Sequence, residues 1–183
     1  MDQPFSTAQN PGEAEPALIL TLKLDADSFV LLNRLRRRYF PPERNYLQAH
    51  VTLFHALPGT HYAAIDDLLR REAASIATIP LSFASVRSLG HGVAVVLDSP
   101  GLLTLRGRLA TAWSAWLTPQ DRQKFRPHVT VQNKVSVDEA RELYEQLSAT
   151  WQPVAGSGLG LSLWKYRGGP WEEVSDCNFA ARE

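Results

Sequence analysis

Two copies of one short pattern hold the residues of this sequence that are best suited to chemistry. The tetrapeptide HVTL begins at His50 and the tetrapeptide HVTV begins at His128, and both lie in apolar segments rich in β-branched residues. Side chains alternate between the two faces of a strand, so His50 shares a face with Thr52 and His128 shares a face with Thr130. Each copy is therefore expected to present an imidazole and a hydroxyl together from a rigid strand.

A pair of such histidines suits general acid–base chemistry at a phosphodiester. One imidazole takes a proton from the nucleophile while the other protonates the leaving oxygen, and an ordinary histidine pKa of about 6.5 lets both work near neutral pH. The two threonine hydroxyls can donate hydrogen bonds to the non-bridging phosphate oxygens and stabilise the charge of the transition state. This division of work requires no metal and no other cofactor.

A single His-x-Thr is weak evidence, because threonine is favoured in strands and a half-buried histidine is common there. The second copy, with a helix following each one, favours a site made of His50, Thr52, His128 and Thr130. Two other interpretations stay open. One is a module that binds RNA or a nucleotide in the same place without turnover, and the other is a pair of histidines that only pack within their strands.

Arg126 and Tyr166 are further candidates for binding the substrate. Arg126 has the same parity as His128, and Pro127 keeps it extended, so its guanidinium is placed to hold a phosphate. The alternative for Arg126 is a solvent-exposed residue at the entrance of the strand. Tyr166 lies beside a Gly-Gly-Pro turn among other aromatic residues. Its ring is placed either to stack on a nucleobase or to pack across a hairpin.

Other features carry weaker or negative information. The run Arg34–Arg38 is either a local patch for RNA or the solvated face of a helix. His55 follows His50 by five positions, so we expect it on the opposite face of the strand, where it cannot complete a metal site with His50. The sequence lacks zinc-ligand spacing and both glycine-rich signatures for nucleotide phosphates, so we predict no metal site. Cys177 has no activating neighbour in sequence and is interpreted as a structural thiol.

The composition limits the class of partner. The 183 residues contain 19 Lys plus Arg and 19 Asp plus Glu, so the formal net charge is zero and a global field for coating nucleic acid is excluded. The single cysteine cannot form an internal disulfide, and no apolar run approaches the roughly 20 residues of a membrane helix. We expect a cytoplasmic monomer without membrane contact. Residues 1–16, which are rich in Pro, Gly, Gln and Glu, are expected to form a disordered leader.

Secondary-structure patterns place the motifs within a mixed fold. Asp25 or Asp27 is suited to begin the first helix, Pro41 and Pro42 end it near Arg38, and three further helices are expected at about 61–75, 101–117 and 137–149. Strands are predicted at 17–24, 49–57, 81–86, 93–98, 128–132, 159–167 and 171–176. Several strands follow one another directly, which favours antiparallel pairs and an α+β fold rather than a doubly wound one.

The paired HVTL and HVTV sequences resemble the two H-x-[ST]-x motifs of the 2H phosphoesterase superfamily, especially its bacterial 2′-5′ RNA ligase-like and cyclic phosphodiesterase branch. Arg126 and Pro127 before the second motif, and the total length, also look like that group. The similarity in element order extends over residues 17–176. The resemblance implies two pseudo-two-fold-related lobes of antiparallel sheet with helices outside and a central cleft. Residues 17–183 would then form a single bilobal phosphoesterase domain.

The resemblance also implies which residues do the work. His50, Thr52, His128 and Thr130 are expected to line the cleft and to act on 2′,3′-cyclic or 2′-5′ phosphodiester bonds of RNA ends or small nucleotides. The predicted function is a metal-independent phosphodiesterase that hydrolyses such bonds or ligates through them. Which histidine is the acid and which the base stays open at this point, as does the choice between hydrolysis and ligation in the cell.

Overall fold

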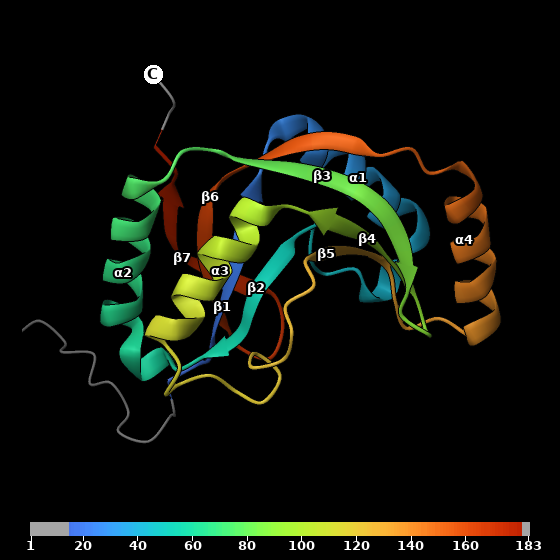
Figure 1. Ribbon diagram of the computed structural model, residues 1–183. Coiled ribbons are helices and arrows are strands. Elements are labelled where there is room, and N and C mark those ends of the chain that lie inside the picture. Colours follow the sequence, from blue (N-terminus) through green and yellow to red (C-terminus); the bar gives the residue numbers. More distant parts are fainter. Residues whose placement is uncertain (1–14, 181–183) are drawn as a thin grey trace, which may run out of the picture.

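A computed structural model describes residues 15–180 as an α+β arrangement of seven strands and four α-helices (Figure 1). In chain order the elements are β1 (Leu18–Leu24), α1 (Ala26–Tyr39), β2 (Val51–Leu57), α2 (Tyr62–Ser75), β3 (Ile79–Ser88), β4 (Val93–Asp98), α3 (Pro100–Ala112), β5 (His128–Gln132), α4 (Val137–Thr150), β6 (Val154–Tyr166) and β7 (Trp171–Asn178). Short 3₁₀ helices cover Pro42–Arg44 and Gly59–His61. Most of the predicted leader at 1–16 lies outside the described residues.

All seven strands belong to one sheet, and each named strand pair is antiparallel. The long strand β6 connects two groups of strands. Its first part pairs with β3, which continues to β4 and β5, while its second part pairs with β7. Along its other edge β6 pairs with β1, which continues to β2. The two motif strands, β2 and β5, therefore end the two groups, and the predicted antiparallel α+β fold is confirmed.

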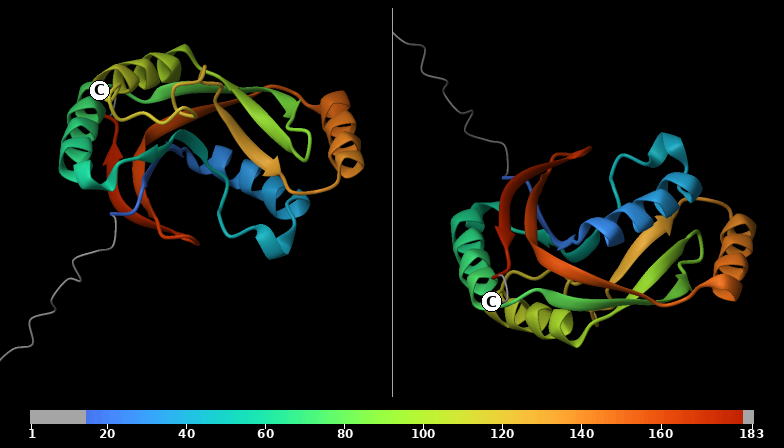
Figure 2. Two further views of the ribbon diagram at one scale, coloured as in Figure 1. Left: turned by 90° about the horizontal axis from the view of Figure 1, so that it is seen from below. Right: turned by 90° about the horizontal axis from the view of Figure 1, so that it is seen from above.

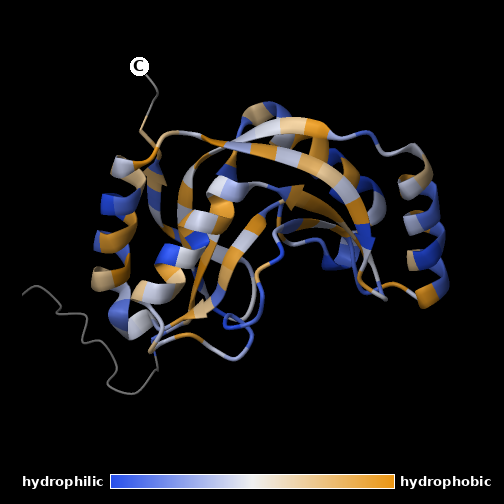
Figure 3. Ribbon diagram, viewed as in Figure 1, coloured by the Kyte–Doolittle hydropathy of each residue, from blue (hydrophilic) through white to orange (hydrophobic). Residues whose placement is uncertain are grey.

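The helices cover the sheet from several sides. The helix α1 packs on β5 and β6, α4 packs on β3 and β4, α2 packs on β6 and β7, and α3 packs on β3. Figure 2 shows α2 and α4 at opposite ends of the molecule, with α1 and α3 on opposite sides of the strands. Figure 3 shows β4 as almost entirely hydrophobic, while α2 and α4 carry both hydrophobic and hydrophilic residues. Within residues 15–180, no helix is both long and apolar enough to cross a membrane.

The third α-helix is shorter than the sequence pattern predicts. It ends at Ala112 rather than at Leu117, and the chain continues in tight turns in which Ser114 and Trp116 donate to carbonyls three residues back. The apolar spacing continues beyond the helix because Trp113 is fully packed in the core and Trp116 stacks on His61. Periodicity alone does not distinguish these turns from a further turn of α-helix.

Strand β2 contains a β-bulge at the last residue of the first motif. Thr52 and Phe54 pair with successive residues of β1, so Leu53 is an extra residue in the ladder. Leu53 and Phe54 are consequently both buried, and the alternation of side chains changes parity. The prediction that His55 faces away from His50 is wrong, because the bulge returns His55 to the face that carries Thr52.

Asp25 connects the start of α1 to the central strand β6. Its carboxylate accepts hydrogen bonds from the backbone N–H and the hydroxyl of Ser28, and from the backbone N–H of Ser157. Burial of the carboxyl raises its pKa, but the combined effect of these hydrogen bonds is larger and lowers it. The pKa of Asp25 therefore lies below the ordinary value of 3.8. The ionised carboxylate thus fixes the helix that carries much of the support for the site.

We predict that Asp25→Ala lowers the free energy of unfolding at pH 7 by about 1–2 kcal/mol, because it removes the helix cap and leaves donors unpaired. Since the folded-state pKa is depressed, this contribution is present above the unfolded pKa near 4 and is lost as the pH falls through the folded pKa. Urea denaturation at pH 7 and pH 3 measures the effect. The matched control is Asp27→Ala in the same first turn, and an equal loss in both variants would contradict the assignment.

Candidate active site

The two motifs line one cavity, although they are far apart in the sequence. His50 directly precedes β2 and Thr52 lies in it, while β5 contains His128 and Thr130. The central cavity, as we name it, has a volume of about 210 Å³ and is lined by Ile19, His50, Thr52, His55, His128, Thr130 and Trp171. All four residues predicted to form the catalytic group are thereby brought together.

Both motif histidines are held by the backbone in the same way. Nδ1 of His50 lies 2.7 Å from the carbonyl oxygen of Gln48, and Nδ1 of His128 lies 2.9 Å from the carbonyl oxygen of Arg126. A carbonyl oxygen only accepts hydrogen bonds, so Nδ1 of His50 carries the proton. Nδ1 of His128 also lies 3.2 Å from the guanidinium of Arg87, which is a donor, but the carbonyl is nearer, and we assign the proton to Nδ1 of His128 as well. In the neutral imidazole the other nitrogen, Nε2, is then the free base that is available to the cavity.

A buried arginine connects the two motifs. Arg36 of α1 is 5% exposed, and its Nη1 donates to the carbonyl of Thr130 at 2.8 Å. Its Nε donates to the carbonyl of Leu47 at 2.9 Å and to the side-chain oxygen of Asn45 at 2.8 Å. One guanidinium therefore holds both the segment that leads into His50 and the strand that carries the second motif.

This placement divides the basic run Arg34–Arg38 into two kinds of residue. Arg34, Arg37 and Arg38 are exposed, as both interpretations from the sequence require. Arg36 is buried, and all of its recorded hydrogen bonds go to protein oxygens. Both interpretations are wrong for Arg36, because its position on the helix points the guanidinium between α1 and the motif segments.

The histidine pair sits in an environment that disfavours the charged imidazolium. Burial lowers the pKa of His50 to about 4, and the positive charge of Arg36 acts in the same direction. The hydrogen bond to the Gln48 carbonyl raises the pKa, but by less. Burial also lowers the pKa of His128 from its ordinary value of 6.5, and Arg87, whose Nη2 lies 3.2 Å from its Nδ1, adds to this effect. In the free protein near neutral pH both rings are therefore mainly neutral.

A third histidine reaches the central cavity because of the bulge in β2. Nδ1 of His55 lies 3.0 Å from a carboxylate oxygen of Asp121, whose side chain is 1% exposed. Asp121 also accepts the backbone N–H groups of His55 and Ala56, and these hydrogen bonds outweigh burial and lower the pKa of the carboxyl. Simple alternation along the strand placed His55 on the face opposite His50, whereas both residues line the central cavity. The position of His55 depends on the register between β2 and β1, which the sequence of β2 alone does not reveal.

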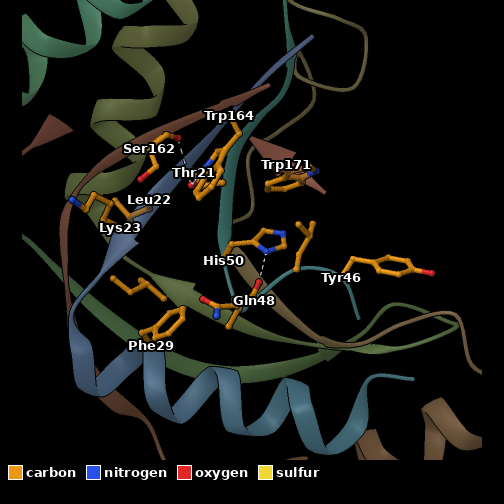
Figure 4. Close-up of a pocket in the computed structure, with 13 residues that line it drawn as sticks. Thr21, Leu22, Lys23, Phe29, Tyr46, Gln48, His50, Ser162, Trp164 and Trp171 are labelled. Atoms are coloured by element: carbon orange, nitrogen blue, oxygen red, sulfur yellow. Dashed lines mark hydrogen bonds between the residues drawn. The ribbon is translucent and has the colours of Figure 1, made fainter. Parts of the chain in front are cut away.

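On the His50 side, the central cavity adjoins an aromatic recess of about 360 Å³, which includes Phe29, Tyr46, His50, Trp164 and Trp171 (Figure 4). The ring centroids of His50 and Trp171 are 4.8 Å apart, and those of Trp164 and Trp171 are 6.2 Å apart. Tyr166 is exposed and is not among the residues lining this recess. The hairpin thus directs its tryptophans, rather than the predicted tyrosine, toward the site.

On the His128 side lies a basic recess of about 480 Å³, to which Thr52, His55, Arg87, Lys124, Arg126 and His128 contribute. Arg126 precedes β5 and lines this recess rather than the central cavity, while its backbone carbonyl orients His128. Its predicted role in holding phosphate stays a prediction. Among residues 15–180, no group of three or more His, Cys, Asp or Glu side chains is placed to hold a metal ion.

The antiparallel α+β fold and the paired His-x-Thr motifs are those of a 2H phosphoesterase. The chain belongs to the 2′-5′ RNA ligase superfamily, whose family model matches residues 24–170, and the predicted family is confirmed. No curated protein matches the chain.

Solved structures that resemble this protein support the same fold. A phosphoesterase structure is 20% identical, with 92% of this chain and 99% of that chain covered and a TM-score of 0.61. TT0787 of Thermus thermophilus is 15% identical, with 91% and 100% covered and a TM-score of 0.62. LigT of E. coli, complexed with NADP+, is 17% identical, with 90% and 98% covered and a TM-score of 0.58. At these identities the likeness establishes the shared fold alone.

The lowered histidine pKa values predict an acidic optimum. If His50 and His128 act as acid and base, the active form has one ring protonated and one neutral, and its population is greatest between the two pKa values. Both values lie below the ordinary 6.5. We therefore expect kcat/KM for a 2′,3′-cyclic nucleotide to give a bell-shaped profile with its maximum below pH 6.5. Initial rates between pH 4 and 9 measure it, and a flat profile or a maximum near pH 8 would contradict the assignment.

Proposed function

We propose that the protein is a metal-independent phosphodiesterase that hydrolyses, or reversibly ligates through, 2′,3′-cyclic or 2′-5′ phosphodiester bonds of RNA ends or small nucleotides. The observation that carries the proposal is the matched pair of imidazoles, each with Nδ1 bonded to the carbonyl two residues upstream and each lining one cavity. In this proposal the strand groups that end at β2 and β5 are the two pseudo-two-fold-related lobes, and the central cavity lies in the cleft between them.

The two recesses suggest how a cyclic substrate lies in this cavity. A nucleobase stacks well on aromatic rings, so we place the nucleoside in the aromatic recess beside His50. Its 2′,3′-cyclic phosphate then lies between His50 and His128, with the hydroxyls of Thr52 and Thr130 donating to non-bridging oxygens. Water attacks in line from the side opposite the leaving ribose oxygen, which is the His128 side.

This orientation assigns a role to each imidazole. His128 Nε2 takes a proton from the attacking water as the new P–O bond forms, and the bond between phosphorus and one ribose oxygen breaks. Protonated His50 gives its proton to that ribose oxygen, and the product is a ribose phosphomonoester. Ligation follows the same course, with the hydroxyl of an RNA end in place of water, and cleavage of the resulting phosphodiester back to the cyclic phosphate is its reverse. The low pKa of His50 makes it a strong acid once it is protonated beside a bound phosphate.

We predict that His50→Ala and His128→Ala each reduce turnover of a 2′,3′-cyclic nucleotide by about 10²–10⁴-fold, because each removes one proton-transfer step. The assay includes a metal chelator, which is expected to leave wild-type activity intact. His91→Ala is the matched control, since His91 is exposed and lies outside the three cavities. Undiminished activity in either motif variant would overturn the assignment. Binding without any turnover by the wild type would instead favour the nucleotide-binding module.

The placement of the nucleoside gives a separate prediction for Trp171. Trp171→Ala is expected to raise KM for the cyclic nucleotide about tenfold, since stacking on an aromatic ring contributes about 1–3 kcal/mol per base. Trp171→Phe should restore much of the affinity because it keeps a ring. Trp116→Ala, which removes a tryptophan stacked on His61, is the matched control. An unchanged KM in Trp171→Ala would place the base elsewhere.

A further inference from the structure

The basic recess lies on the side of the central cavity opposite the aromatic recess, and it has a surplus of positive charge. It shares Thr52, His55 and His128 with the central cavity, while the aromatic recess shares His50 and Trp171 with it. A phosphodiester between the two motifs therefore has a different environment on each side. One side suits a ring, and the other suits an anion.

The cations of the basic recess are without carboxylate partners. Within residues 15–180, none of Arg87, Lys124 and Arg126 forms an ion pair. Nε of Arg87 is buried and has no hydrogen-bond partner there. A buried guanidinium N–H without a partner is unfavourable, so an acceptor brought by a ligand would complete it.

The one carboxylate that lines this recess is already engaged. Asp121 accepts the ring N–H of His55 together with the backbone N–H groups of His55 and Ala56, and the hydroxyl of Thr118 also donates to it. Its backbone carbonyl accepts from buried Arg106. Asp121 thus has little capacity left to repel or pair with a ligand.

His55 lines both the central cavity and the basic recess. Asp121 fixes the Nδ1 side of its ring, which leaves Nε2 for the side of the cavity, and the side chain is 45% exposed. The recess thereby has a ring nitrogen of His55 next to the position of the reacting phosphate, and Arg87, which lines the same recess, supplies a guanidinium.

We propose that the basic recess binds a second phosphate group of the substrate, held by His55, Arg87, Lys124 and Arg126, on the side of the reacting phosphate away from the nucleoside in the aromatic recess. The preferred substrate is therefore an oligonucleotide whose strand continues with a further phosphate beyond the reacting one, rather than one with a single phosphate. This inference rests on the proposed function for the position of the reacting phosphate, but its test does not require turnover.

The test compares binding of two ligands that differ by one phosphate: the 2′-5′-linked dinucleotide of adenosine, and the same dinucleotide with a phosphate on its free 2′-hydroxyl. Titration calorimetry is done in a His50→Ala background, which prevents turnover and leaves the recess intact. We expect the phosphorylated ligand to bind about tenfold more tightly, through new charge-assisted hydrogen bonds. Adding His55→Gln or Lys124→Gln should reduce this preference to about threefold or less, and raising the salt concentration should weaken it.

Two further variants separate this role from a structural one. His61→Gln and Arg141→Gln, added to the same background, remove an exposed imidazole and an exposed guanidinium outside the recess and should leave the preference unchanged. Equal binding of the two ligands by the background protein would overturn the proposal, as would a preference that survives both His55→Gln and Lys124→Gln. If His55→Gln does not fold, the exposed Lys124 still provides the test. Wild-type turnover of a 2′,3′-cyclic mononucleotide, measured in parallel, tests the central cavity separately.

Discussion

The position of the two motifs depends on the buried guanidinium of Arg36. It donates to backbone or side-chain oxygens of the segment before β2 and to the carbonyl of Thr130 in β5, and it lies 4.1 Å from the centroid of the Phe40 ring. A buried charge is tolerated only when its donors are matched, and here they are matched by groups from both motif segments. Burial lowers the pKa of Arg36 to about 10, so the side chain stays charged at neutral pH. Neighbouring Asn33 adds a further link by accepting the N–H of Ala49.

The two histidines of the site are held by the same kind of hydrogen bond, but the residues around each of them differ. Each imidazole is oriented by the carbonyl two residues upstream, which the segment leading into each strand provides without any additional side chain. The hairpin of β6 and β7 then adds aromatic rings next to His50, and the loop before β5 adds cations next to His128. The zero net charge of the chain is compatible with phosphate chemistry, because a local group of cations, Arg87, Lys124 and Arg126, lines one recess.

Local patterns in the sequence predicted the parts of the site that depend on one strand at a time. Alternation placed His50 with Thr52 and His128 with Thr130, and all four line the central cavity. Relations between strands were not predictable in this way. His55 enters the cavity through a bulge that is defined only by pairing with β1, as the register between neighbouring strands is a tertiary property.

The same limit explains the other differences. The buried role of Arg36 is hidden within a run of arginines, three of which are exposed. The contact of Asp121 with His55 spans 66 positions of the chain, and no spacing rule connects them. Tyr166 and Trp171 are paired across the hairpin, yet only Trp171 lines the aromatic recess, since the outcome depends on twist and on what lies opposite.

The central claim is that the two imidazoles flank one phosphate, and a crystal structure of the protein with adenosine 2′-phosphate tests it most directly. We predict one phosphate group between the motifs, with oxygens within about 2.6–3.2 Å of Nε2 of both His50 and His128, and with the base in the aromatic recess. A phosphate that contacts only one of these histidines, or that binds outside the central cavity, would contradict the claim.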